Sequence, residues 1–319
     1  MKTNFLNFLF VASLLMVASI ASAQTTKTDV DKPLQHAAVV SPNLPPYVVF
    51  CGDTIRFDRY DLRERLDREL TSFCYTHATS LMIFKRANRI FPEVEPILKE
   101  NGVPDDFKYL MVIESNLIAT SRSGVGAAGY WQFMEATAKE YGLVVNSTVD
   151  ERYNTAKATA AACKYLKDAK KVCGKWISAA ASYNAGQQRI SASLKNQGET
   201  SATDLWLNTE TSRYIFRILA IKIIMENPRA YGFHLKKEQL YQPFEYETYT
   251  VNSSISDLVA WAKEHNTSYF VLKDNNLWLR STKLDNSSGR SYVIRIPTKA
   301  SQYYKPAKVK VHSQKWIGH

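Results

Sequence analysis

The sequence has 319 residues, 45% of them hydrophobic, and a formal net charge of +11 at pH 7. This length suits one large domain and one small one. After the first residues no apolar run is long enough to cross a bilayer, so we expect no integral membrane span.

Residues 1–23 have the features of a cleaved secretory signal peptide. One Lys precedes the apolar stretch from Phe5 to Ile20, and Ala21-Ser22-Ala23 comes before Gln24. No Cys follows the cleavage point, so the sequence gives no sign of a lipoprotein anchor. We expect an exported protein. Its basic charge suits an anionic wall or surface polysaccharide better than nucleic acid, unless the charge serves only solubility.

The next segments predict a linker and then a mainly α domain. Residues 24–48 contain the Pro-rich SPNLPP and lack apolar periodicity, which is typical of a linker. From there to about residue 234 the apolar spacing is helical, with loops expected in the Gly- and Ser-rich stretch 121–129 and at 196–203. The predicted helices are 62–73, 76–90, 94–99, a helix that begins after Pro104 and carries Glu114, 131–141, 155–172, 176–182 and 209–227.

The composition changes near Tyr241. Aromatic residues and Val alternate with Glu, Thr and Asn over 244–251, which predicts a strand. A helix over 255–263, a second helix and a strand over 292–296 complete a βααβ unit within 241–297. Residues 298–319 are rich in Lys and contain no acid, and they predict a disordered basic tail.

Neither the four cysteines nor the six histidines show the spacing of metal ligands, so we expect no metal and no cofactor. Cys163 and Cys173 are predicted to lie on one helix, about 15 Å apart, which is too far for a disulfide. A bridge between Cys51 and Cys74 remains possible in an oxidising compartment.

Glu114 is the most unusual side chain in the sequence, because it ends an apolar run that begins at Phe107. At helical spacing Phe107, Met111, Glu114 and Leu117 share one face, so the carboxyl is expected to be buried and its pKa raised. A carboxylic acid that keeps its proton near neutral pH can protonate a leaving glycosidic oxygen. The alternative is a structural ion pair with a basic partner.

Three segments together carry a family resemblance: Glu114-Ser115, GAAGYWQF from Gly126 to Phe133, and SYNAG from Ser182 to Gly186. In this order and spacing they resemble the lytic transglycosylases of the goose-type-lysozyme superfamily, glycoside hydrolase family 23 type, and among them the membrane-bound D type. The likeness covers residues 95–235. It implies a lysozyme-like helical catalytic domain.

The resemblance also implies a mechanism. Glu114 would first act as the acid that protonates the oxygen between N-acetylmuramic acid and N-acetylglucosamine. It would then act as the base for the C6 hydroxyl, which closes onto C1 and leaves a 1,6-anhydro end without water. Because this nucleophile is intramolecular, no second carboxylate is needed.

Substrate-binding roles are expected for six residues, some with structural alternatives. Ser115 can bond Glu114, the substrate or its own helix backbone. The tyrosine and amide of SYNAG can brace the substrate or cap a helix, whereas Trp131 and Phe133 are expected in the core. The candidates are Ser115, Gly129, Gln132, Tyr183, Asn184 and, from the family-like Glu210-Thr-Ser-Arg-Tyr214 segment, Tyr214.

The βααβ unit resembles a degenerate LysM module, a fold that binds glycans containing N-acetylglucosamine. Asn252-Ser-Ser-Ile255 replaces the usual Gly-Asp-Thr after the first strand. Sugar binding and a purely packing role therefore both remain open for this unit.

The sequence leads to a peptidoglycan lytic transglycosylase that acts on glycan strands, with a periplasmic location if the organism has an outer membrane. One alternative is a lysozyme-like hydrolase in which Asp150 or Glu151 is the second carboxylate. The other is a non-catalytic wall-binding protein. Protein partners are not predicted.

Overall fold

The helical pattern of the first two thirds of the chain builds the larger of two domains. The computed structural model describes residues 40–318, so the predicted signal peptide and most of the predicted linker lie outside the described residues. From Pro42 onward the chain forms one compact unit. Within residues 40–318, no helix is both long enough and apolar enough to cross a membrane.

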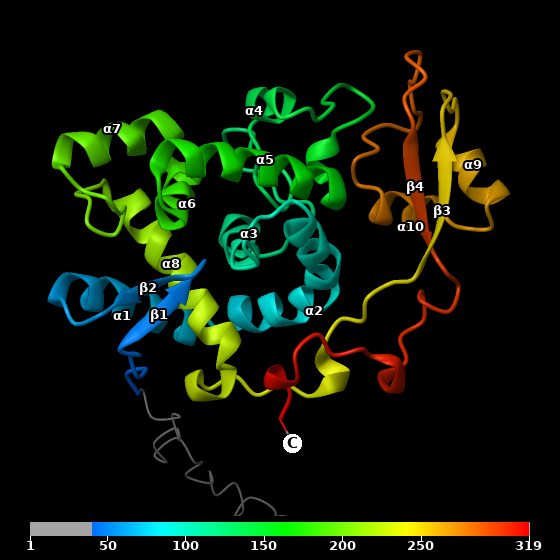
Figure 1. Cartoon of the computed structure of the whole chain (residues 1–319). Coiled ribbons are helices and arrows are strands. Elements are labelled where there is room, and N and C mark those ends of the chain that lie inside the picture. The colour runs from blue at the N-terminus through cyan, green and yellow to red at the C-terminus, as the bar shows by residue number, and fades with distance from the viewer. Residues whose placement is uncertain (1–39, 319) are drawn as a thin grey trace, which may run out of the picture. The chain divides into compact units, whose positions relative to one another are not determined.

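The mainly α prediction is confirmed. The helix named α3 lies between α2 and α8, in the middle of the domain (Figure 1). The helices are α1 (Tyr60–Tyr75), α2 (His77–Glu100), α3 (Phe107–Ser115), α4 (Glu135–Glu140), α5 (Thr155–Cys173), α6 (Trp176–Ala185), α7 (Gln187–Gln197) and α8 (Thr209–Glu226). One short 3-10 turn lies between α4 and α5, at Glu151–Tyr153. Others come after α8, at Pro228–Tyr231, Lys237–Gln239, Pro306–Lys308 and Gln314–Trp316.

Helix α3 is buried on every side. Each residue from Phe107 to Ile113 is buried, including Lys108, whose Nζ donates to Glu95 at 2.7 Å. A helix that is apolar all round belongs in the centre of a domain, and this is where α3 lies. The sequence predicted that only one face of this helix is buried, and the structure shows burial on all faces. Leu117, which was predicted to share that face, lies beyond the helix, which ends at Ser115.

The structure differs from the predicted elements in four places. A hairpin of β1 (Tyr47–Phe50) and β2 (Asp53–Arg56) precedes the helices, and its turn places Cys51 and Gly52 at φ of 53° and 89°. Helix α2 continues through both of its prolines, because Val94 and Leu98 bury their side chains against the core. Helix α4 begins only at Glu135, and the sequence missed α7 altogether.

The small domain has the predicted βααβ order: β3 (Tyr246–Val251), α9 (Leu258–Glu264), α10 (Tyr269–Asn275) and β4 (Tyr292–Pro297). The two strands pair antiparallel, with Tyr249 opposite Ile294. Asp257 and Ser268 cap α9 and α10, since each side chain accepts hydrogen bonds from first-turn backbone N–H groups.

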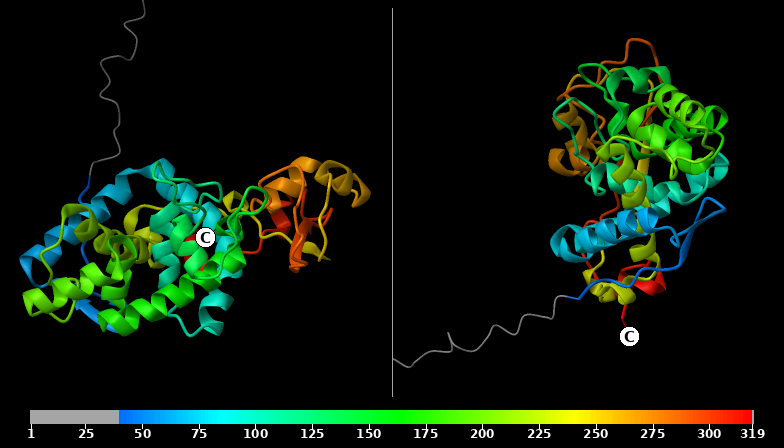
Figure 2. Two further views of the ribbon diagram at one scale, coloured as in Figure 1. Left: turned by 90° about the horizontal axis from the view of Figure 1, so that it is seen from above. Right: turned by 90° about the vertical axis from the view of Figure 1, so that its left-hand side faces the viewer.

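The two domains share part of their cores. Val149 and Tyr153 of the helical domain belong to the same buried cluster as Trp278 and Leu279 of the small domain. The backbone N–H of Asp150 also donates to the carbonyl of Trp278 at 2.8 Å. The β3 and β4 strands therefore lie beside the helical domain as a docked module (Figure 2).

The prediction of a disordered basic tail is wrong. Val309 and Trp316 are 2% and 4% exposed, and the Trp316 ring packs edge-on against Phe84 with centroids 5.5 Å apart. The Nε1 of Trp316 donates to the carbonyl of Met225 at 2.8 Å. Two apolar anchors thus hold the tail on the helical domain, and its many lysines hid them in the composition.

We predict that Trp316→Ala lowers the free energy of unfolding by about 4 kcal/mol, because it empties a fully packed site and removes a buried hydrogen bond. Urea denaturation measures this change. Trp206 is the matched control, since it is 90% exposed and its truncation should cost less than about 0.5 kcal/mol. Equal effects of the two changes would contradict an anchored tail.

Candidate active site

Glu114 lies at the last turn of α3, where the chain leaves the core. The two residues that follow the helix, Asn116 and Leu117, are both left-handed, with φ of 49° and 56°. This conformation is costly for a bulky residue such as Leu and is found mainly where the surrounding structure holds it in place, often at functional sites. The turn leaves Glu114 only partly exposed.

The carboxyl of Glu114 is paired with a phenol, not with a base. The hydroxyl of Tyr214 donates to Oε1 at 2.5 Å. Burial is the largest influence and raises the pKa of Glu114, as does the negative charge of Glu210, while the Tyr214 hydrogen bond and the charge of Arg217 lower it. The net result is a pKa of about 7. The structural ion pair considered as an alternative is not formed, and the expected direction of the pKa shift is confirmed.

Helix α8 supplies one wall of the site. Glu210, Tyr214 and Arg217 are spaced by four and three residues, so they share the helix face that turns toward Glu114. Of these three residues, only Tyr214 was predicted to be a site residue. The spacing of the two charged residues about Tyr214 is the signal that could have added them.

Tyr183 and Asn184 lie near this wall at the end of α6. The hydroxyl of Tyr183 donates to the carbonyl of Trp131 at 2.8 Å, and the nearby Glu114 charge contributes to its strongly raised pKa. The amide oxygen of Asn184 accepts from the hydroxyl of Thr211 at 2.9 Å. These contacts fix both side chains, so that α6 and α8 are joined beside Glu114.

Gln132 lies next to Trp131 in a strained loop, with φ of 49°. Its Nε2 donates to the carbonyls of Gly129 and Ser121 at 2.8 and 3.2 Å, while no described residue donates to its side-chain oxygen. That oxygen is available as an acceptor. Trp131 is fully buried, as expected of a core residue.

Two of the candidate residues have structural roles in this arrangement. The hydroxyl of Ser115 donates to the carbonyl of Met111 at 3.2 Å and makes no bond with Glu114. Gly129 has φ of 78°, and a Cβ there would lie 2.0 Å from the carbonyl oxygen of Arg152. Glycine is therefore required by packing at this position.

The two carboxylates considered for a hydrolase are held in ion pairs. Asp150 accepts from Arg152 at 2.8 Å, and both side chains are almost fully buried. Glu151 pairs with Lys157 and accepts from the backbone N–H of Val144 at 2.8 Å. Neither group is a free carboxylate that could activate water.

The thiols and possible metal ligands do not form a second site within the described range. Among residues 40–318, no group of three or more His, Cys, Asp or Glu side chains is placed to hold a metal ion. All four cysteines are free thiols, and Cys163 and Cys173 lie on α5 as predicted.

A helical domain with one partly buried carboxyl at the end of its central helix is followed by a βααβ module, in the order that the sequence predicted. Residues 94–205 match the transglycosylase SLT domain, and residues 247–300 match the soluble lytic transglycosylase C-terminal LysM-like domain. The first match lies within the helical domain, and the second lies over the βααβ module.

The chain is homologous to membrane-bound lytic murein transglycosylase D. The protein from Escherichia coli strain K12 is 29% identical over 194 residues, which are 58% of this chain and 42% of that protein, and the protein from strain CFT073 gives the same values. A solved inactive mutant of lytic transglycosylase Slt from Pseudomonas aeruginosa matches with 23% identity and a TM-score of 0.33, over 42% of this chain and 24% of that one. The chain thus spans less than half the length of the curated relatives it matches.

We predict that Glu114→Gln stabilises the protein at alkaline pH but not at acid pH. In the folded state the Glu114 carboxyl has a pKa of about 7, whereas its ordinary value is 4.5. The folded state therefore binds the proton more tightly than the unfolded state, and the free energy of unfolding falls as the pH rises between these two values. The neutral amide avoids this loss, which amounts to about 3 kcal/mol. Urea denaturation of both proteins at pH 4 and pH 8 measures it. A stability difference that does not change with pH would contradict a buried Glu114 carboxyl.

Proposed function

We propose that this protein is a peptidoglycan lytic transglycosylase that cleaves the β-1,4 bond between N-acetylmuramic acid and N-acetylglucosamine. The observation that carries the proposal is the Glu114 carboxyl, whose pKa is raised to about 7 by burial. Such a group holds a proton at neutral pH and can both donate it and take it back. The SLT and LysM-like matches support the same substrate class.

In the proposed reaction Glu114 protonates the bridging oxygen as the bond from this oxygen to C1 of the muramic acid breaks. The C6 hydroxyl of the same sugar then closes onto C1 and gives its proton to the Glu114 carboxylate. The acid is restored, no water is consumed, and the new end is a 1,6-anhydro sugar. Intramolecular attack makes a second carboxylate unnecessary.

The groups around Glu114 fit this cycle. Tyr214 stabilises the carboxylate through its hydrogen bond while the proton is on the product, and the Arg217 charge acts in the same direction. The free side-chain oxygen of Gln132 suits an N–H or hydroxyl group of a sugar. We assign Tyr183 and Asn184 to the positioning of this wall, because their polar groups are already bonded within it.

The alternatives receive less support. A hydrolase needs a second carboxylate to activate water, and both Asp150 and Glu151 are held in ion pairs. A non-catalytic binding protein has no use for a carboxyl whose burial costs stability when it is charged. We further propose export by the predicted signal peptide to the cell envelope, with periplasmic action on murein.

We predict that Glu114→Gln lowers the rate of murein cleavage by about 10²- to 10⁴-fold, because the amide can neither donate nor accept the proton. Mass spectrometry of digested murein measures the released fragments. Wild-type products should carry anhydro ends, which are lighter than hydrolysed ends by one water. Hydrolysed ends would favour the lysozyme-like reaction, and retention on murein without release would favour a binding protein.

We predict that Tyr214→Phe moves the alkaline limb of kcat/KM to higher pH. In the wild type this limb should fall as the pH rises above about 7, because Glu114 must be protonated to act as an acid. Removing the Tyr214 hydroxyl takes away a bond that favours the carboxylate, so the pKa of Glu114 rises. A limb that stays in place while the rate falls would indicate a structural role for Tyr214 alone.

A further inference from the structure

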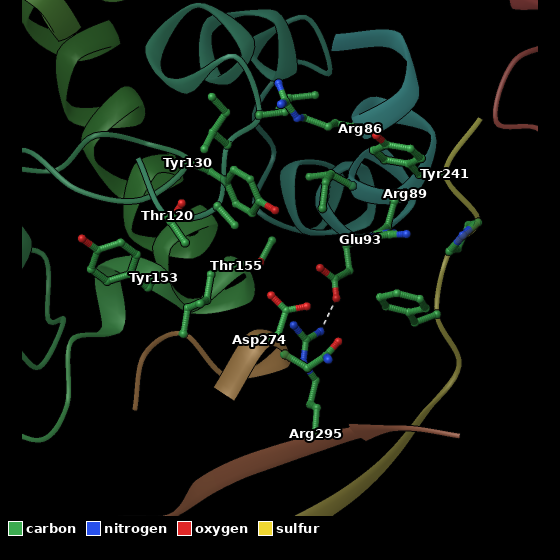
Figure 3. Close-up of a pocket in the computed structure, with 18 of the residues that line it drawn as sticks. Arg86, Arg89, Glu93, Thr120, Tyr130, Tyr153, Thr155, Tyr241, Asp274 and Arg295 are labelled. Atoms are coloured by element: carbon green, nitrogen blue, oxygen red, sulfur yellow. Dashed lines mark hydrogen bonds and ion pairs between the residues drawn. The ribbon is translucent and has the colours of Figure 1, made fainter. Parts of the chain in front are cut away.

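A pocket of about 490 Å³ lies where the helical domain meets the LysM-like domain. Figure 3 shows side chains that surround it. They come from α2, the segment after α3, the loop that contains Tyr130, the start of α5 and the turn before it, the connection before β3, β3 itself, α10 and β4. None of the sequence-predicted site residues lines it. The lining residues that matter here are Arg86, Arg89, Tyr130, Tyr246, Asp274 and Arg295.

The pocket is formed before any ligand binds. The shared buried cluster and the backbone bonds between residues 148–150 and 278–280 fix the small domain against the large one. An ion pair between Glu93 of α2 and Arg295 of β4 joins the two sides, and the guanidinium of Arg295 lies 4.6 Å from the centroid of the Tyr246 ring. Largely preformed pockets between domains are typical binding sites.

Arg89 brings to this pocket a positive charge that forms no ion pair with a described residue, and the charge of Asp274 acts on it through space. Its Nε donates to the carbonyl of Gln242 at 3.0 Å, and its guanidinium lies 4.1 Å from the centroid of the Phe244 ring. Burial lowers its pKa, and it has no ion pair within residues 40–318. The Nη groups that remain are a fork suited to a carboxylate.

Other groups add donors and flat apolar surfaces. The hydroxyl of Tyr130 points into the pocket and makes no hydrogen bond with any described residue (Figure 3). Burial raises the pKa of Tyr130, so it remains a donor. Arg86 donates to the carbonyl of Asn116 at 3.1 Å and likewise has no ion pair in the described part of the chain. The rings of Tyr130, Phe244 and Tyr246 offer faces for a sugar.

The pocket is connected to the proposed active site through the chain. Leu117 to Thr120 line the pocket, and Thr120 is only six residues beyond Glu114, so their Cα atoms are at most about 20 Å apart. Tyr130 stands two residues before Gln132. Arg86 holds the carbonyl of Asn116 in the turn that exposes Glu114. A glycan strand of several sugars can therefore reach both places.

We propose that this pocket binds a carboxylate carried by a muramic acid residue of the same glycan strand that Glu114 cleaves. This inference rests on the proposed function and adds a subsite at the LysM-like domain. Arg89 pairs with the carboxylate, Tyr130 donates to it or to a neighbouring sugar oxygen, and Arg86 adds positive charge. Both the lactyl group of muramic acid and its peptide stem supply such a carboxylate.

Titration calorimetry on the full chain carrying Glu114→Gln tests the proposal without turnover. The probes are muramyl dipeptide, N-acetylmuramic acid and the neutral tetramer of N-acetylglucosamine. Adding Arg89→Met should weaken binding of muramyl dipeptide by about tenfold or more, because a charge-assisted pair is lost. Tyr130→Phe, which removes only an unbonded hydroxyl, should weaken it about threefold. Binding of the neutral tetramer should stay within about twofold.

Arg63→Met is the matched control, since Arg63 is exposed on α1 and its side chain makes no hydrogen bond, ion pair or ring contact with a described residue. It should leave all three probes unchanged. In muramyl dipeptide the lactyl carboxyl forms the amide bond to the peptide, so stronger binding of N-acetylmuramic acid supports the proposal through the lactyl carboxylate. Stronger binding of the dipeptide supports it through a carboxylate of the stem, and equal binding shows that the pocket accepts either one.

The proposal is overturned if neither N-acetylmuramic acid nor muramyl dipeptide binds, if folded Arg89→Met and Tyr130→Phe proteins bind both probes as before, or if the neutral tetramer loses affinity equally. Murein digestion by the wild type is scored separately for anhydro ends. A failure there removes the proposed reaction and leaves the binding result intact, so the two failures are distinguishable.

Discussion

The burial of the Glu114 carboxyl at the end of α3 is the constraint on which the site depends. A helix buried on every side can leave a carboxyl partly exposed only near one of its ends, and Glu114 lies in the last turn of α3. The two left-handed residues that follow turn the chain away at once and leave the carboxyl partly exposed. Central packing and the unusual acidity of Glu114 therefore have the same origin.

The opposing helix sets how far that acidity is shifted. Burial alone favours the protonated form, while the Tyr214 hydroxyl and the Arg217 charge favour the carboxylate. The balance is a pKa near neutrality, which suits the proposed role of giving and regaining one proton. Because both restoring groups are on α8, the packing of α8 against α3 controls the chemistry as well as the stability.

The second domain extends this arrangement and is not an independent appendage. Its core includes residues of the helical domain, and the C-terminal segment returns to pack beneath α2 and α8 (Figure 1). This rigid docking creates the pocket around Arg89 and Tyr130. In the proposed function, a LysM-like module that is fixed in this way forms one wall of the substrate path.

The sequence by itself determined the helical class, the βααβ module, the family-like motifs and Glu114, because periodicity and motif spacing are local properties. It missed the first hairpin and α7, whose signals are short, and it treated the tail as disordered because two apolar anchors were hidden among lysines. Only the tertiary structure decided that Ser115 bonds its own helix, that Gly129 is required by the Arg152 carbonyl, and that Asp150 and Glu151 are paired. The physical reason is that burial, charge balance and pockets between domains arise from contacts between residues far apart in the chain, such as Glu114 with Tyr214 and Glu93 with Arg295, and no local pattern specifies them.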